Sequence, residues 1–120
     1  MTNVSTLSIL LVDDEPAIRS LMEMALVEAG YRVFQASNGN EALQVFDEQG
    51  QDIALVITDM RMPYVGGGEL IAELQARRQS LKCLCMSGYA QASDVTVPLL
   101  KKPFSRGELL GKVRSILSAA

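Results

Sequence analysis

Five polar residues stand directly after short apolar runs, and their types are ones that can carry out chemistry together. They are Asp13, Asp14, Asp59, Ser87 and Lys102. Three carboxylates in one place repel one another unless a divalent cation or an ammonium group offsets their charge. Because hard oxygen ligands without histidine or thiolate favour Mg²⁺ over zinc, the implied cation is magnesium. Such a group can transfer a phosphoryl, with a carboxylate attacking phosphorus.

Each of these residues then has a role. Asp59 is the nucleophile, Asp13 and Asp14 join it in holding the metal, and Ser87 and Lys102 hold the transferred phosphoryl group. Each also has an ordinary interpretation, since Asp after a strand commonly forms a turn or caps a helix. Likewise, Ser before Gly is commonly a plain turn, and Lys before Pro is commonly solvated surface. The chemical interpretation is favoured because all five residues occupy matching strand ends.

Strand-like apolar runs alternate with helical patterns along the chain. Strands are predicted over 7–12, 32–36, 53–57, 81–86 and 98–101, the last suited to an edge because it starts at Pro98. Helices are predicted over 18–29, closed by Gly30, from the N-cap Asn38 through Phe46, over 69–78, and after the capping box Ser105–Glu108. The inward stripe predicted for the first helix is Ile18, Leu21, Met22, Ala25, Leu26 and Ala29.

This alternation predicts an α/β fold, in which right-handed crossovers build a parallel sheet with helices on both faces. In such sheets, ligands bind at the carboxyl ends of the strands, near the point where the strand order reverses. If the spatial order is 2-1-3-4-5, the strands that end in the five polar residues are neighbours about 5 Å apart. Their side chains then meet over one rim of the sheet.

Composition narrows the classes of protein. The chain has 120 residues, 48% of them hydrophobic and 21% charged, which predicts one folded domain over 1–120, with Thr6 to Ala119 as its approximate folded part. A net charge of −3 without blocks of like charge argues against direct binding of nucleic acid. The longest apolar run is too short to span a membrane and no signal peptide is evident, so a cytoplasmic location is expected.

Two residue counts exclude further chemistry. The chain has no histidine, which rules out Ser-His-Asp and Cys-His catalysis and the common zinc sites. The two cysteines, Cys83 and Cys85, are two positions apart in an apolar run. On a strand they point to one face, an unusual arrangement for a disulfide, so we expect buried small hydrophobic side chains in a reducing compartment.

Four stretches together resemble the receiver domain of bacterial two-component response regulators, including the chemotaxis regulators. They are Ile9–Glu15 (ILLVDDE), Val56–Pro63 (VITDMRMP), Met86–Tyr89 (MSGY) and Lys101–Phe104 (KKPF). The resemblance covers essentially the whole chain. It implies the flavodoxin-like order 2-1-3-4-5 of a doubly wound five-stranded sheet.

The resemblance also implies a function and its partners. A histidine kinase or a histidine phosphotransfer protein supplies the phosphoryl group, and an output domain or partner protein reads the result. The backbone carbonyl of Arg61 completes the metal site, and Gly67 lets the loop after Asp59 turn tightly. The hydroxyl of Ser87 moves toward the phosphate and rearranges the surface around the last strand and last helix.

Three departures from the family pattern are visible. Leu99 replaces the usual Phe or Tyr three residues before the lysine, so an aromatic rotamer switch cannot operate as usual. Only 15 positions separate Ser87 from Lys102, which predicts a short, irregular or mobile helix over 90–97. Glycines at 66–68 replace the usual Asp-Gly-Leu, which predicts a more flexible loop.

Two other functions compete with a phosphoaccepting receiver that turns over no external substrate. The first is a module of receiver shape that binds partners without phosphorylation, favoured by Leu99 and the short segment but disfavoured by the five intact site residues. The second is a small phosphatase with an aspartyl nucleophile. Such an enzyme usually needs a second acid two residues after the nucleophile, and this chain has Arg61 there.

Overall fold

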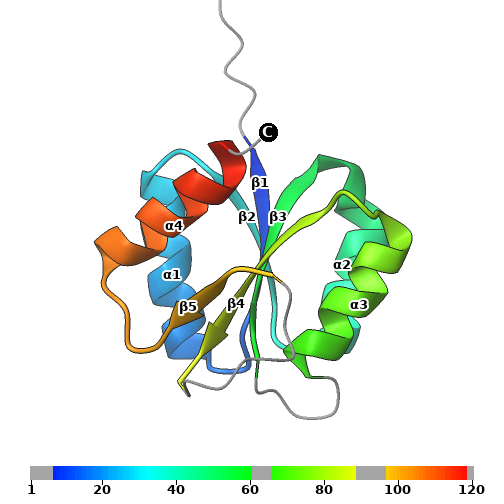
Figure 1. The fold of residues 1–120 in the computed structure, drawn as a ribbon, viewed down its shortest axis with the longest axis horizontal. Helices are drawn as coiled ribbons and strands as arrows, with labels where there is room; N and C mark the ends of the chain where they lie inside the picture. The colour runs from blue at the N-terminus through cyan, green and yellow to red at the C-terminus, as the bar shows by residue number, and fades with distance from the viewer. Residues whose placement is uncertain (1–6, 61–65, 89–96, 119–120) are drawn as a thin grey trace, which may run out of the picture.

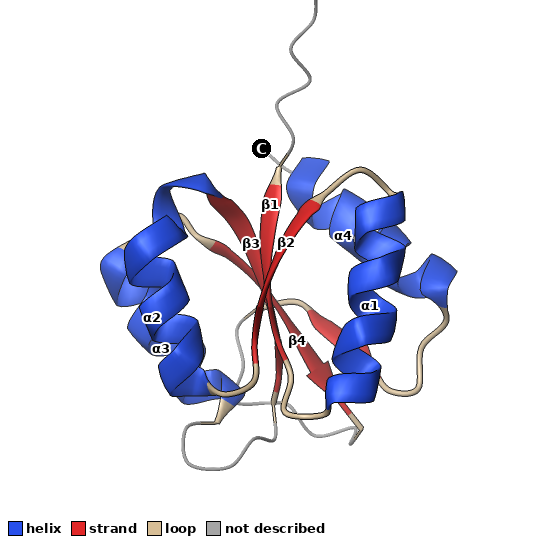
Figure 2. Ribbon diagram, turned by 180° about the vertical axis from the view of Figure 1, so that it is seen from behind, coloured by secondary structure: helices blue, strands red, loops and turns tan. Residues whose placement is uncertain are grey.

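The computed structural model describes residues 7–60, 66–88 and 97–118, which form one parallel sheet flanked by helices. The five strands lie in the order β2-β1-β3-β4-β5, so the predicted fold class and strand order are confirmed. Figures 1 and 2 show α1 and α4 covering one face of the sheet and α2 and α3 covering the other. The ends of the predicted folded part, Thr6 and Ala119, lie outside the described residues.

The strands are short, and the central ones are buried on both faces. Their bounds are β1 Ser8–Val12, β2 Arg32–Ala36, β3 Ile53–Asp59, β4 Lys82–Ser87 and β5 Leu99–Lys101. The β3 strand runs two residues further than the apolar run predicted, because Thr58 and Asp59 continue the ladder opposite Cys85 and Met86. The last residue of this central strand is therefore Asp59.

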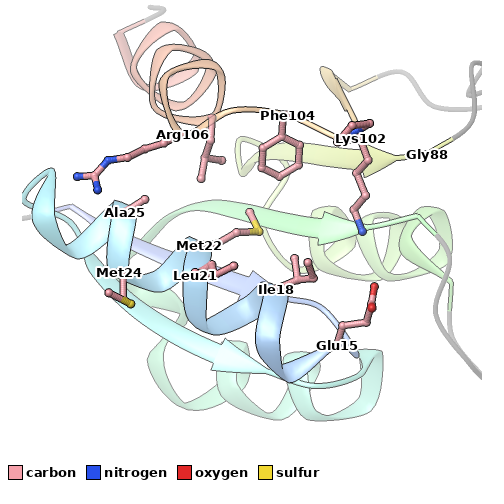
Figure 3. A pocket seen from close by; sticks show the side chains of 12 residues that line it. Glu15, Ile18, Leu21, Met22, Met24, Ala25, Gly88, Lys102, Phe104 and Arg106 are labelled. Carbon is pink, nitrogen blue, oxygen red and sulfur yellow. The ribbon is translucent and has the colours of Figure 1, made fainter.

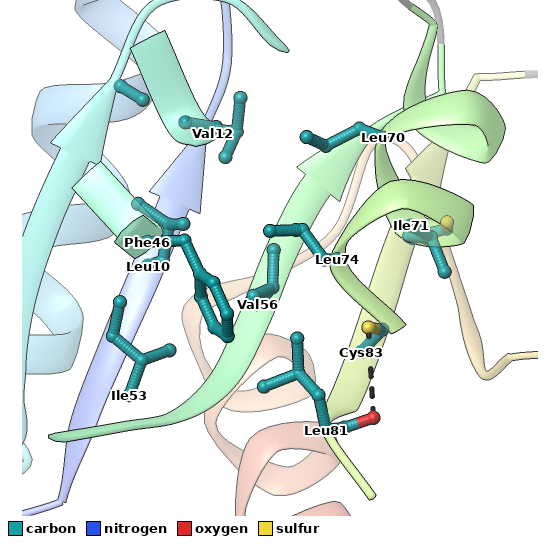
Figure 4. Packing of buried hydrophobic residues seen from close by; sticks show 13 residues of the cluster. Leu10, Val12, Phe46, Ile53, Val56, Leu70, Ile71, Leu74, Leu81 and Cys83 are labelled. Carbon is teal, nitrogen blue, oxygen red and sulfur yellow. Dashed lines mark hydrogen bonds between the residues drawn. The ribbon is translucent and has the colours of Figure 1, made fainter. Parts of the chain in front are cut away.

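Alternation along the strands divides the interior into two cores. On β1, Leu10 and Val12 face the layer of α2 and α3, whereas Ile9 and Leu11 face α1 and α4. Figure 4 shows the first core, where Phe46, Leu70 and Leu74 pack on β1 and β3. Both cysteines belong to this core and are free and buried, as predicted. The two cores fix the sheet, and with it the rim at the carboxyl ends of the strands.

The helices begin and end largely where the sequence signals place them. Their bounds are α1 Pro16–Glu28, α2 Gly39–Gln49, α3 Gly67–Arg77 and α4 Arg106–Ser118, with a short 3₁₀ turn at Gly50–Asp52. Gly30 has φ +102° and, with Tyr31, donates back to the last turn of α1, so it closes that helix as predicted. Asn38 caps α2, and Ser105 and Glu108 exchange the two hydrogen bonds of a capping box. No helix within the described ranges is long and apolar enough to cross a membrane.

Two predictions about the helices are wrong. Leu21 and Ala29 were expected to face inward from α1, but Leu21 is 65% exposed and Ala29, which follows the last helical residue, is exposed as well. Met22, Ala25 and Leu26 already fill the contact with the sheet. The α3 helix begins at Gly67 rather than Glu69, so Gly67 and Gly68 lie in its first turn and only Gly66 precedes it. The predicted irregular helix over 90–97 falls outside the described residues, apart from Val97, and the flexibility predicted from the glycines at 66–68 stays a prediction.

Candidate functional site

Strand register brings the predicted site residues to one rim. Val12 pairs with Thr58, so the next residues, Asp13 and Asp59, end neighbouring strands side by side. On the other side of β3, Ser87 ends β4 and pairs with Lys101 of β5. The backbone N–H of Lys102 then donates to the Ser87 carbonyl at 2.7 Å, which carries the β4–β5 pairing up to the lysine.

The three carboxylates form one compact cluster. Oxygen atoms of Asp13, Asp14 and Asp59 all lie within 4.8 Å of one another. Asp13 is fully buried and Asp59 is 7% exposed, whereas Asp14 is exposed. Three negative charges at this spacing repel one another, so the cluster favours binding of a cation.

Lys102 supplies part of that positive charge. Its Nζ lies 2.8 Å from Oδ2 of Asp59, to which it donates a hydrogen bond, and 3.7 Å from Oδ2 of Asp13. Burial lowers the pKa of the Lys102 ammonium, but the hydrogen bond and charge of Asp59, together with the charges of Asp13 and Glu15, outweigh it and hold that pKa above its usual value. Lys102 therefore stays protonated at neutral pH, with its ammonium group next to the carboxylates of Asp59 and Asp13. Its peptide bond to Pro103 is cis.

Asp13 leaves an oxygen atom available to a cation. Its Oδ1 accepts a hydrogen bond from the backbone N–H of Glu15 at 2.9 Å. Its Oδ2 is buried and has no hydrogen-bond partner among the described residues. Burial raises the pKa of the Asp13 carboxyl, only partly opposed by the Glu15 N–H and by Lys102. A buried carboxylate oxygen without a hydrogen bond, next to two further carboxylates, fits a hard divalent cation such as Mg²⁺.

For the other residues singled out in the sequence, the structure gives a position on the sheet or no position. Ser87 is buried at the last position of β4, on the same rim as Asp59. Arg61, whose backbone carbonyl was predicted to complete the metal site, lies outside the described residues. Leu99 starts β5 opposite Cys85 and packs, half-buried, on the core under the rim.

Gly67 lies against the backbone that carries the candidate nucleophile. Its N–H donates to the Met60 carbonyl at 3.1 Å. A Cβ at this position would fall within 3.0 Å of the Asp59 carbonyl oxygen and 2.9 Å from the Met60 Cα. Because both atoms belong to the main chain, neither can move aside as a flexible side chain could. The glycine expected to allow a tight turn is thus needed for close approach to Asp59, and its φ is not in the left-handed region.

Sequence reasoning missed one polar residue near the cluster. Arg19, in the first turn of α1, donates from Nη1 to the Asp13 carbonyl at 2.6 Å and from Nε to Gln35 Oε1 at 2.9 Å. A signal for it existed in the sequence. A cation near the N-terminus of a helix opposes the helix dipole and so is expected to have another partner.

An apolar groove adjoins the cluster and was also missed. It has a volume of about 710 Å³, and Figure 3 shows side chains of α1 facing Phe104 and Arg106, which follow β5, across it. Lys102 and Glu15 lie at the end nearest the carboxylates. The groove is lined by Glu15, Ile18, Leu21, Met22, Met24, Ala25, Gly88, Lys102, Pro103, Phe104, Arg106 and Leu109. The exposure of Leu21 and Met24, at 65% and 59%, follows from their position on this open face.

Comparison with known proteins finds the same fold and family. Sensor kinase CckA of Brucella abortus is 35% identical over 117 residues, which cover 92% of this chain and 12% of that protein. A probable transcriptional regulatory protein of Picosynechococcus is also 35% identical, with 91% of this chain and 48% of that protein covered. The chain thus spans half or less of these two relatives.

A solved structure supports the same relationship. The response regulator TrrA of Thermotoga maritima, in complex with Mg²⁺-BeF, has a TM-score of 0.85 and 34% identity, covering 92% of this chain and 99% of that one. The family profile described as response regulator receiver domain matches residues 9–114. Together with the strand order and the strand-end residues, these matches show that the chain belongs to the response regulator receiver domains of two-component signalling.

Proposed function

We propose that Asp59 accepts a phosphoryl group, in a magnesium-dependent reaction, from a phosphohistidine on a histidine kinase or histidine phosphotransfer protein. One observation carries the proposal. The Lys102 ammonium lies 2.8 Å from Asp59, in a cluster where Oδ2 of Asp13 is buried without a hydrogen bond. Such a group is prepared for a cation and for the negative oxygens of a phosphoryl group.

The transfer exchanges one bond for another. A carboxylate oxygen of Asp59 attacks phosphorus in line with the phosphorus–nitrogen bond, which breaks and leaves its electron pair on the donor imidazole. The products are an aspartyl phosphate and a histidine without its phosphoryl group. Lys102 is placed to stabilise the charge on the phosphoryl oxygens, and we assign the hydroxyl of Ser87 a hydrogen bond to one of them.

Asp13, Asp14 and Asp59 would hold the Mg²⁺, with the Arg61 carbonyl as a further ligand. When bound, the ion neutralises the carboxylates and the phosphoryl oxygens and aligns the two reacting groups. The chain's own contribution is to fix these ligands at the strand ends.

The phosphoryl group would act as a signal rather than as the product of turnover. Attack by water on phosphorus breaks the bond between phosphorus and the Asp59 oxygen, which releases inorganic phosphate and returns Asp59 to its carboxylate. The domain would thus promote its own phosphorylation and dephosphorylation, and we expect no turnover of external phosphate esters. An output domain or partner protein would read the change on the surface near β5 and α4, biased by the new negative charge. We place this signalling in the cytoplasm, since two free, buried cysteines suit a reducing compartment.

Intact mass after treatment with phosphoramidate tests the proposal. With Mg²⁺ the protein should gain one phosphoryl group, and it should gain none when the metal is chelated. Asp59→Asn removes the nucleophile and should abolish labelling while leaving a folded domain. Labelling of the Asp59→Asn variant at the wild-type rate, or labelling that does not depend on Mg²⁺, would contradict the assignment.

The apolar groove is the surface on which we propose that the protein donor docks. Any macromolecule that brings an imidazole to Asp59 must cover the rim, and the groove shares Lys102 and Glu15 with that rim. Exposed Leu21 and Met24 extend it along α1. These side chains offer apolar contact to an amphipathic helix of the donor.

Two donors separate docking from chemistry. Leu21→Asp should slow labelling by a phosphorylated histidine phosphotransfer protein that labels the wild type, by about tenfold or more, and leave labelling by phosphoramidate unchanged. Val27→Asp is the matched control, since Val27 is 52% exposed on the same helix but does not line the groove. Equal rates for both variants with the protein donor would refute docking in the groove.

The alternative, a module that binds partners without phosphorylation, predicts no site for Mg²⁺. The compact carboxylate cluster disfavours it. Titration with Mg²⁺ followed by NMR distinguishes the two functions, since saturable shifts at the rim are expected only for the phosphoacceptor.

A further inference from the structure

Arg19 is bound to the main chain of the carboxylate cluster rather than to its side chains. Its guanidinium bridges the carbonyl oxygen of Asp13, at 2.6 Å, and the side-chain oxygen of Gln35 on β2, at 2.9 Å. We propose that Arg19 is a positioning residue, which sets the peptide between Asp13 and Asp14 and so holds these two carboxylates in the arrangement that binds Mg²⁺. The inference rests on the proposed function, because it concerns the same metal site.

The contacts of Asp13 show what Arg19 adds. The Asp13 N–H donates to the Ala36 carbonyl at 3.2 Å, and Oδ1 accepts from the Glu15 N–H at 2.9 Å. Arg19 holds the carbonyl, so three polar groups of Asp13 are fixed by the protein and Oδ2 is left for the cluster. The carbonyl is the group that orients the next peptide, and rotation there would carry the Asp14 side chain away from Asp13 and Asp59.

Gln35 anchors the Arg19 side chain to the sheet. It lies on β2 opposite Leu11 of β1, two residues before Asp13. Arg19 thereby ties the loop after β1 to the sheet through a planar fork whose two donors have a fixed relative direction. The position near the N-terminus of α1 is electrostatically unfavourable for a cation, and a backbone carbonyl with a partial negative charge offsets this.

The contact is expected to act by geometry rather than by net charge. A charge effect would survive in Arg19→Lys, which keeps the cation but has no planar fork to bridge both acceptors. A geometric effect would be lost in Arg19→Lys as well as in Arg19→Gln. Groups that orient metal ligands from behind typically change metal affinity by about 10- to 100-fold when removed.

The experiment compares Mg²⁺ binding by wild type, Arg19→Gln and Arg19→Lys, with Kd measured by NMR titration at fixed ionic strength. Arg114→Gln is the control, because it removes the same charge from an exposed position on α4. We expect Kd to rise about tenfold in both Arg19 variants and to stay unchanged in the control. A second measurement needs no metal. In the metal-free protein, exchange of the Glu15 amide hydrogen should accelerate about tenfold in Arg19→Gln, while the Leu10 amide in β1 stays protected.

Each outcome has one meaning. A wild-type Kd for Arg19→Gln, or a wild-type Kd for Arg19→Lys alone, would overturn positioning by the fork while the proposed function stands. Equal acceleration of exchange at Leu10 and Glu15 would also overturn it, since the residue would then stabilise the fold as a whole. Absence of Mg²⁺ binding by the wild type would instead refute the proposed function, and this inference with it.

Discussion

Replacing Gly67 by alanine tests whether the start of α3 is built to fit against Asp59. The added Cβ would lie within 3.0 Å of the Asp59 carbonyl oxygen and 2.9 Å from the Met60 Cα, closer than real Cβ atoms approach other atoms. To relieve this steric overlap, the N-terminus of α3 or the end of β3 must shift. Overpacking of this kind costs about 1–3 kcal/mol. The lower entropy of the unfolded alanine chain returns about 0.4–1 kcal/mol.

The neighbouring glycine gives the control. Gly68 lies in the same helical turn, and a Cβ there meets nothing within 4 Å. Gly68→Ala should therefore stabilise the domain by about 0.5–1 kcal/mol, through helix propensity and the unfolded chain. Gly67→Ala should destabilise it by a net value of about 1–2 kcal/mol, after the entropic gain is subtracted. The same substitution at two adjacent positions should thus change the free energy of unfolding in opposite directions.

Urea unfolding measures both free energies, and labelling by phosphoramidate measures the consequence at Asp59. Because the clash falls on the Asp59 backbone, Gly67→Ala should slow labelling by at least about tenfold at a urea-free condition where the variant is folded. Gly68→Ala should label at the wild-type rate. If both variants shifted stability in the same direction, or if Gly67→Ala labelled normally, the steric reasoning would be wrong.

Three further predictions follow from the charges and thiols. Burial raises the pKa of Asp13, so the folded state binds more protons than the unfolded state, and its stability falls as the pH rises from 3.8 to that raised pKa. Asp13→Asn should therefore increase the free energy of unfolding of the metal-free protein at pH 7 by about 1 kcal/mol, measured by urea unfolding. In Mg²⁺ the variant should lose that advantage, because the wild type is then stabilised by the bound ion. The pKa of Lys102 is also raised, so its pairing with Asp59 stabilises the fold fully below pH 10.5, and this stabilisation is lost as the pH rises through the raised pKa. Lys102→Met should therefore flatten the fall in Tm as the pH rises above 10.5. Burial raises the pKa of Cys83 and of Cys85 to about 12. Neither thiol should therefore react with a disulfide reagent at pH 8 until the protein is unfolded. Rapid reaction of either thiol in the folded protein would contradict this.

The carboxyl ends of the strands could be predicted from the sequence, because the apolar pattern of a strand stops there and the residue spacing of a helix begins soon after. The apolar run 53–57 identifies β3 without any coordinates, and parallel strands must end at the same edge of the sheet. The strand order came from the family resemblance. Given that order, the approach of Asp59 to Asp13 and Lys102 follows from backbone geometry. The local sequence does not show how far a strand continues into polar residues, which is why Thr58 and Asp59 were not included in it.

Leu21 shows what the spacing of apolar residues along a helix cannot predict. A spacing of three and four residues identifies one side of α1 but not how wide the covered stripe is. That width depends on where α4 and the segment after β5 lie, which is a tertiary property. The close approach of Gly67 to Asp59 and the bridge made by Arg19 also depend on two segments meeting, and neither leaves a local pattern beyond an unusual residue type.

Charge balance at the rim constrains the order of events. With their carboxylates ionised, Asp13, Asp14 and Asp59 together with the Lys102 ammonium have a formal charge of −2. A phosphodonor is itself an anion and would meet this charge at short range, where a low-dielectric surrounding strengthens repulsion. One divalent cation brings the formal charge to zero. The carboxylate set that would bind Mg²⁺ therefore also decides when phosphorus can approach, and we expect metal to bind before the donor whichever donor is used.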